Sequence, residues 1–253
     1  MTARLGIVDW GIGGLGLLGH LDRRLPELDV VYWSDTGSVP YGLQPTGTLA
    51  ARLRAVVEVL AEQGCTEVVL ACNAASTVVD RLGAAPVPVA GIISSGVAAV
   101  PDDLRGTVGV VGGRRTIRGG PYRRALARPD RRIVSRVAQP LSAHIEAGRI
   151  GTEAFRDDLA RIVAPICGAE ALILACTHYP AAAADFAAAL PGTALLDPAA
   201  QMAQELVDRL GSAGLRGPGE RVVLTTGDPG LMRTSAHAAW SIDLPEIGAV
   251  SLP

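Results

Sequence analysis

Short apolar runs of strand length alternate with stretches of helical periodicity along most of this chain. Strands are predicted at residues 5–8, 29–33, 67–72, 86–93, 107–113, 133–137, 171–176 and 195–197, with an edge strand at 222–226. Helices are predicted at residues 15–25, 46–63, 75–82, 117–127, 153–167 and 200–210. In the second helix, Leu49, Leu53 and Val56 recur at the spacing of one buried helical face. Strands that alternate with helices predict an α/β protein with parallel sheet.

Two strands end in nearly the same sequence. Residues 67–76 read EVVLACNAAS, and residues 171–180 read ALILACTHYP. Ligands bind beyond the carboxyl ends of the strands in such sheets, so Cys72 and Cys176 are expected to face one site. Each half of the chain runs strand, helix, strand, helix, cysteine strand, which predicts two pseudo-symmetric Rossmann-like lobes with the site between them.

The predicted lobes divide the chain as follows. Lobe one comprises residues 1–95 and 207–253 and carries Asp9 and Cys72, and lobe two comprises residues 96–206 and carries Cys176 and His178. The helix at 200–210 is expected to carry the chain back to lobe one.

Composition narrows the possible functions. The formal net charge of −2 and the lack of a basic block argue against a nucleic-acid partner, and Arg114 and Arg115 are expected to be solvated surface. The apolar runs are interrupted, so no membrane span is predicted. The four cysteines show neither C-x-x-C nor zinc-type spacing, which favours free thiols in the cytoplasm and no metal. Gly11, Gly13 and Gly14 do not complete the dinucleotide fingerprint, so no NAD is expected.

Two opposed thiols permit a specific proton-transfer reaction. The ordinary thiol pKa of about 8.5 allows thiol and thiolate to coexist near neutral pH. One sulfur removes a proton from one face of a carbon while the other delivers a proton to the opposite face, which inverts the centre without a cofactor. Asp9 and His178 are candidate partners for Cys72 and Cys176, and Asn73 and Thr177 are candidate carboxylate ligands.

Structural roles remain open for each of these residues. A cysteine at a strand end is often a small core residue. Asp9 is also a candidate cap for the following helix, and His178 a candidate structural histidine.

At these residues the chain resembles the glutamate racemase family of the aspartate/glutamate racemase superfamily. Residues 6–15, GIVDWGIGGL, are similar to the family's G-x-F-D-S-G-x-G-G-L, and residues 34–42, SDTGSVPYG, to its D-T-x-x-x-P-Y-G loop. Residues 71–76, ACNAAS, resemble A-C-N-T-A-S, and residues 176–180 match C-T-H-Y-P. The resemblance implies cofactor-independent interconversion of L- and D-glutamate, supply of D-glutamate for peptidoglycan, and a homodimer.

The resemblance also assigns residue roles. It makes Cys72 and Cys176 the acid/base pair, assisted by Asp9 and His178. The substrate site is implied to include Trp10, Pro40, Tyr41, Gly42, Asn73, Ala74 and Thr177, and Glu146 is a weaker match to a family acid.

The chain departs from the family pattern at several of these positions. Trp10 and Ala74 replace a serine and a threonine, and Ser94-Ser95 stands where the family has Glu-Pro. Two alternatives therefore stay open, a racemase or epimerase of a different acidic substrate and an inactive racemase-like binding protein.

Overall fold

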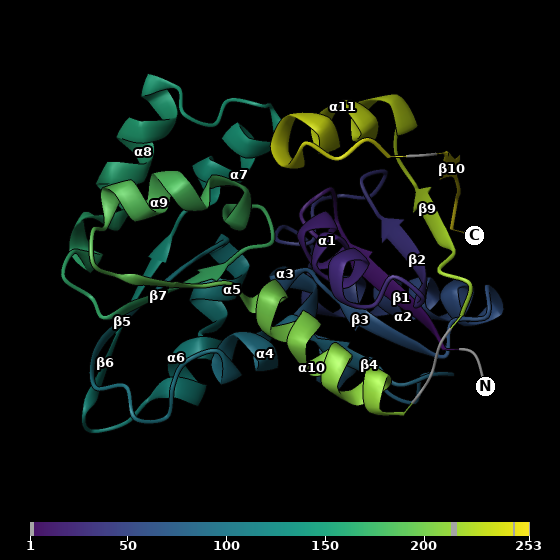
Figure 1. Ribbon diagram of the computed structural model, residues 1–253, viewed down its shortest axis with the longest axis horizontal. Coiled ribbons are helices and arrows are strands. Elements are labelled where there is room, and N and C mark those ends of the chain that lie inside the picture. Colours follow the sequence, from purple (N-terminus) through teal and green to yellow (C-terminus); the bar gives the residue numbers. More distant parts are fainter. Residues whose placement is uncertain (1–2, 214–216, 245, 253) are drawn as a thin grey trace.

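The strands form two parallel sheets that lie side by side, each covered by helices on both faces (Figure 1). The computed structural model describes residues 3–213, 217–244 and 246–252. The first sheet contains, in spatial order, β10 (Ile247–Ala249), β9 (Arg221–Thr225), β2 (Asp29–Ser34), β1 (Arg4–Asp9), β3 (Glu67–Leu70) and β4 (Val89–Gly91). The second contains β6 (Arg131–Val137), β5 (Gly106–Gly112), β7 (Ala171–Ala175) and β8 (Ala194–Leu196). The predicted two-lobed α/β fold is confirmed.

The strand orders of the two lobes correspond. The order β2-β1-β3-β4 in the first sheet has the same connectivity as β6-β5-β7-β8 in the second. Strands β3 and β7, which lead into Cys72 and Cys176, therefore occupy equivalent places. Because all neighbouring strands are parallel, both cysteines lie at a carboxyl edge of their sheet.

Helices follow most strands, as parallel connections require. They are α1 (Leu15–Arg24), α2 (Thr46–Glu62), α3 (Asn73–Ser76), α4 (Ile92–Ala98), α5 (Arg114–Gly119), α6 (Pro121–Leu126), α7 (Gln139–Glu146), α8 (Glu153–Val163), α9 (Ala183–Ala189), α10 (Pro198–Ser212) and α11 (Pro229–Trp240). Short 3₁₀ turns occur at η1 (Val79–Arg81), η2 (Ala164–Ile166) and η3 (Tyr179–Ala182).

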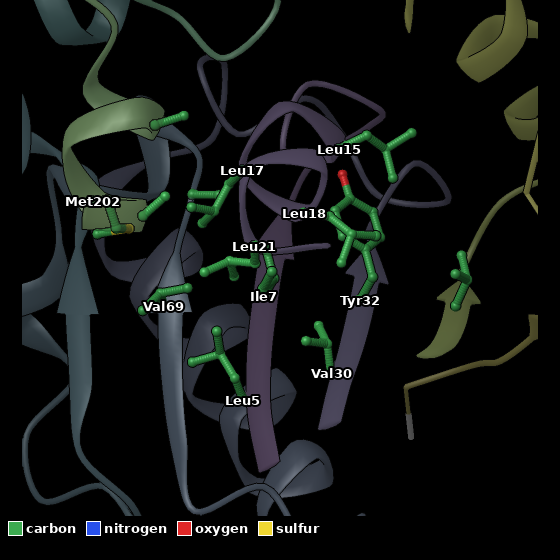
Figure 2. Close-up of a cluster of buried hydrophobic side chains, with 14 of the residues drawn as sticks. Leu5, Ile7, Leu15, Leu17, Leu18, Leu21, Val30, Tyr32, Val69 and Met202 are labelled. Carbon is green, nitrogen blue, oxygen red and sulfur yellow. The ribbon is translucent and has the colours of Figure 1, made fainter. Parts of the chain in front are cut away.

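Figure 2 shows the core on one face of the first sheet. Leucines of α1, including Leu17 and Leu21, pack against Ile7 of β1 and Tyr32 of β2. Each fully buried leucine stabilises the fold by about 1.5–3 kcal/mol. Met202 of α10 joins this cluster, so the helix after β8 does return to the first lobe. The lobe boundaries at 95/96 and 206/207 stay predictions. The first falls within α4 and the second within α10.

Two predicted strands differ from those observed. Only Val89–Gly91 of the predicted strand 86–93 is extended, because the prolines at 86 and 88 cannot donate to a sheet and Ile92 already begins α4. This strand is half-exposed at the sheet edge rather than buried. The prediction that residues 222–226 form an edge strand is wrong, because β10 pairs with the outer side of β9.

Several predicted helices are shorter than the apolar pattern suggested. The segment 117–127 forms two helices, because Gly120 takes a left-handed φ of 64° and Pro121 begins α6. The segment 75–82 contains α3 and η1, and the helix from Glu153 changes at Val163 into the 3₁₀ turn η2, which contains Pro165. Helices α4, α7, α9 and α11 were not predicted.

Candidate active site

A cavity of about 270 Å³ lies between the lobes, at the carboxyl ends of the cysteine strands. Every residue that the sequence nominated for the site lines it, namely Asp9, Trp10, Pro40, Tyr41, Gly42, Cys72, Asn73, Ala74, Cys176, Thr177 and His178. Glu146 lines it as well. The two sequence motifs therefore meet in space, although Cys72 and Cys176 lie 104 positions apart in the sequence.

Cys72 is the half-buried N-cap residue of α3 and lies beside Asp9. Burial raises the pKa of the Cys72 thiol well above its usual value, and the Asp9 carboxylate raises it further. The backbone amides of Ala74 and Ala75 act in the opposite direction but do not compensate. These surroundings therefore favour the thiol form of Cys72 over the thiolate.

Asp9 is buried and makes contacts in both lobes. Its Oδ1 accepts a hydrogen bond from Trp10 N at 2.9 Å, and its Oδ2 accepts from Gly14 N at 2.6 Å and from Thr177 Oγ1 at 3.2 Å. Burial raises the pKa of Asp9. The charge of His178 and the two backbone amides act in the opposite direction but have a smaller effect, so the pKa stays above its usual value. Asp9 thus supports the loop before α1, although the N-cap of that helix is Gly14.

Cys176 has a histidine where Cys72 has a carboxylate. The Cys176 Sγ lies 3.8 Å from His178 Nδ1, and His178 Nε2 lies 3.4 Å from Glu146 Oε2. The Glu146 contact is an attraction between charges rather than a directed hydrogen bond, because Nε2 has no hydrogen-bond partner among the described residues. Burial alone lowers the pKa of His178, but Cys176 and Glu146 together raise it well above its usual value. The imidazolium form is therefore favoured beside Cys176.

Two hydrogen bonds fix the loop that carries Tyr41. The Tyr41 hydroxyl donates to Asp35 Oδ2 at 2.8 Å, and the Trp10 indole donates from Nε1 to Ser38 O at 3.1 Å. Trp10 is held against this loop while it lines the cavity. A large apolar surface therefore occupies the position where the family pattern has a serine.

Comparison with known proteins decides the family. The family model described as Asp/Glu/hydantoin racemase matches residues 20–206. The chain belongs to this family. It is 35% identical over 238 residues to the glutamate racemase of Herpetosiphon aurantiacus, covering 89% of this chain and 93% of that protein. It is 36% identical over 244 residues to the glutamate racemase of Thermus thermophilus, covering 93% and 91%.

Solved racemase structures share the whole fold. The crystal structure of glutamate racemase from Thermus thermophilus in complex with β-chloro-D-alanine superposes with a TM-score of 0.88 at 31% identity, covering 99% of this chain and 98% of that one. The glutamate racemase of Francisella tularensis in complex with D-glutamate gives a TM-score of 0.88 at 25% identity, with the same coverage. The family resemblance predicted from the motifs is confirmed.

The prediction that Arg115 is a solvated surface residue is wrong. Arg115 lines the cavity from α5. Its guanidinium donates across the gap between the lobes to Thr77 Oγ1 at 2.7 Å, to Gln44 O at 2.8 Å and to Thr46 Oγ1 at 3.0 Å. Burial lowers the pKa of Arg115, and Cys72 opposes this change.

Other lining residues were missed by the sequence analysis. They are Gly113, Thr116, Gln139, Ser142, Ala143 and Ala175. Three of them, with Glu146, lie on α7, which begins with Gln139-Pro140 and buries Leu141 and Ile145. A proline in the first turn and apolar residues four apart were the available signals for this helix.

The described residues were compared with the requirements of a metal site and of a membrane-spanning helix. None of the described His, Cys, Asp and Glu side chains form a group of three or more suited to hold a metal ion. No helix within the described ranges is long and apolar enough to cross a membrane.

Replacing Glu146 with glutamine is expected to lower the pKa of His178, because the variant lacks the carboxylate that faces Nε2. A histidine whose folded-state pKa is raised contributes stability below its unfolded pKa of about 6.5, and that contribution is lost as the pH rises through the folded-state pKa. Glu146→Gln should therefore destabilise the protein most in mildly acidic solution.

NMR titration of the His178 ring, assigned with a His178→Asn variant, checks the pKa. Urea unfolding below and above the titration of His178 checks the stability. Glu58→Gln, on the exposed side of α2, is the matched control. An unchanged His178 titration in Glu146→Gln would contradict the role given to this carboxylate.

Proposed function

We propose that this chain interconverts L- and D-glutamate by two-base proton transfer between Cys72 and Cys176, with no organic cofactor or metal. The observation that carries the proposal is that the two thiols, from equivalent strands of two lobes, line one cavity. Each thiol also has a titratable neighbour, Asp9 beside Cys72 and His178 beside Cys176. The similarity to glutamate racemases, one of them in complex with D-glutamate, supports glutamate as the substrate.

In one direction, Cys176 acts as the base. Its sulfur takes the α-proton, the C–H electron pair passes into the adjacent carboxylate, and the Cys72 thiol gives its proton to the opposite face of the α-carbon. Cys72 is left as the thiolate and Cys176 as the thiol, so the opposite direction starts from that state. The imidazolium of His178 favours the charged form of the neighbouring sulfur.

Polar groups at the same cavity would hold the substrate. Asn73 and Thr177 follow the two cysteines directly and line the cavity. Asn73 is proposed to donate to a carboxylate oxygen from its side-chain amide, and Thr177 from its backbone N–H, because the Thr177 hydroxyl already donates to Asp9. Tyr41, Gly42, Trp10 and Ala74 also line the cavity.

Proton NMR in deuterated water, with purified protein and either enantiomer of glutamate, tests the function. We expect the α-proton signal to disappear and the other enantiomer to form without any added cofactor. Folded protein with free thiols that leaves both enantiomers unchanged would contradict glutamate as the substrate.

A second candidate is the racemisation or epimerisation of a different acidic compound. Trp10 and Ala74 favour it, because an indole and a methyl group line the cavity where the family pattern has two hydroxyl groups. A site that lacks such groups loses affinity for the substrate that they would bind. Exchange measured across a panel of acidic amino and hydroxy acids distinguishes the two candidates. The absence of exchange with every compound of the panel would favour a binding protein instead.

We further propose that the chain works as a homodimer in the cytoplasm and supplies D-glutamate for peptidoglycan. Light scattering during gel filtration should give the mass of two chains. A mass of one chain at all concentrations would contradict the dimer.

A further inference from the structure

The Asn73 side chain is buried, and one end of its amide lacks a partner. Asn73 is 3% exposed, and it lines the cavity at the start of α3. Among the described residues, no group makes a hydrogen bond with its Nδ2. A buried amide nitrogen without a partner costs free energy, and the cost disappears when a ligand accepts its protons.

The other end of the same amide is fixed from the second lobe. The Tyr122 hydroxyl donates to Asn73 Oδ1 at 2.7 Å, over a separation of 49 residues. Tyr122 lies on α6 and is 2% exposed, packed among Val100, Val110 and Leu126. Its ring therefore has little freedom to follow a movement of the Asn73 amide.

The direction of this hydrogen bond decides which way the amide faces. Burial, followed by the charge of Asp197, raises the pKa of Tyr122, so its hydroxyl keeps its proton. That proton is donated to the amide oxygen, which leaves the nitrogen as the end available to a ligand. Without the tyrosine hydroxyl, the amide could rotate and present its oxygen to a carboxylate, which would repel it.

Gly96 makes room for this arrangement. A Cβ atom at Gly96 would lie 2.5 Å from the Tyr122 hydroxyl oxygen and 2.7 Å from its Cε1. Both are distances that real Cβ contacts do not show, so the phenol reaches Asn73 only because residue 96 has no side chain.

We propose that Tyr122 is the positioning residue for Asn73, holding its carboxamide so that the amide N–H groups bind a carboxylate of the amino-acid substrate. This inference rests on the proposed function for its substrate class. Tyr122 itself touches no substrate, and it acts only through the orientation of Asn73.

Tyr122→Phe keeps the ring in its packed position and removes only the hydroxyl. We expect this variant to raise KM and the Kd for glutamate by about tenfold, the scale of one hydrogen bond to a charged group, with a smaller change in kcat. Asn73→Ala should raise both constants at least as much. The double variant should be no worse than Asn73→Ala, because the two residues act as one unit.

Ser95→Ala is the matched control. Ser95 is buried on α4, which packs against α6, and its hydroxyl donates to Glu205 at 2.7 Å outside the cavity. We expect this variant to lose thermal stability without a change in KM.

Glutamate binding is measured by calorimetry, and turnover is measured separately, for every variant. The two measurements distinguish a failure of the proposed racemase function from a failure of the positioning role of Tyr122. A wild-type protein that binds glutamate but does not racemise it would contradict the proposed function and still allow the Tyr122 test. The inference is overturned if Tyr122→Phe stays within twofold of wild type, if its effect adds fully to that of Asn73→Ala, or if Ser95→Ala raises KM equally.

Discussion

Cys72→Ser and Cys176→Ser are each expected to lower kcat/KM for racemisation by about 10²- to 10⁴-fold, the range of general acid–base catalysis. A serine hydroxyl is a far weaker acid than a thiol, so it neither gives nor takes the α-proton at a useful rate. Each variant retains one thiol on one face of the substrate. We therefore expect residual α-proton exchange from a single enantiomer, with a different enantiomer for each variant.

Racemisation is measured from the circular dichroism signal of glutamate, which is lost as the two enantiomers become equal. Exchange of the α-proton for deuterium is followed by NMR in the same variants. Cys167→Ser, which changes an exposed thiol that does not line the cavity, is the matched control and should keep full activity. Either active-site variant with undiminished racemisation in both directions would refute the two-base proposal.

Arg52→Met is expected to destabilise the protein by about 3–5 kcal/mol, the usual consequence of leaving a buried charge unpaired. Asp35 is fully buried and accepts from Arg52 Nε at 3.0 Å and from Nη2 at 2.7 Å. The same carboxylate accepts from Tyr41 and from Thr226 Oγ1, so it joins a cavity residue to the end of β9. KM should rise as well, because Tyr41 loses its fixed position.

Urea unfolding gives the free energy, with the slope compared between variants to check that unfolding stays cooperative. Arg54→Met is the control on the same helix. It removes hydrogen bonds to the backbone carbonyls of Leu82 at 2.8 Å and Arg81 at 3.4 Å, and a loss of about 1 kcal/mol is expected. Adding Asp35→Asn to Arg52→Met should restore part of the stability. Equal losses in the Arg52 and Arg54 variants would rule out a special cost for the Asp35 charge.

The site residues that could be predicted from the sequence lie in short continuous segments at the ends of strands. Cys72 and Cys176 each follow an apolar strand directly, and the same short segments contain Asn73 and His178. Parallel strands present their carboxyl ends at one edge, so the position of these residues followed from the fold class. Glu146 was nominated only as a weaker match to a family acid, because the segment before it is one residue shorter than in the family pattern. The structure places its Oε2 3.4 Å from His178 Nε2.

What the sequence could not reveal depends on how the lobes meet. Arg115 looks like a surface residue next to Arg114, and only the approach of α5 to Gln44, Thr46 and Thr77 gives it three partners. The contact from Tyr122 to Asn73 likewise joins segments of different lobes. The edge position of β9 was mispredicted because β10, only three residues long, carries too little pattern to be recognised.

The unlike neighbours of the two thiols have a consequence for the kinetics. Mirror-image amino acids have equal free energies in solution, so the equilibrium constant between them is unity whatever the protein does. The ratio kcat/KM must therefore be the same for both enantiomers, even though Cys72 lies beside a carboxylate and Cys176 beside a histidine. The chemical asymmetry of the site can appear only as a higher kcat matched by a higher KM for one enantiomer. The two thiols thus occupy equivalent places in the two lobes but have different neighbours, and kcat/KM is nevertheless equal for the two enantiomers.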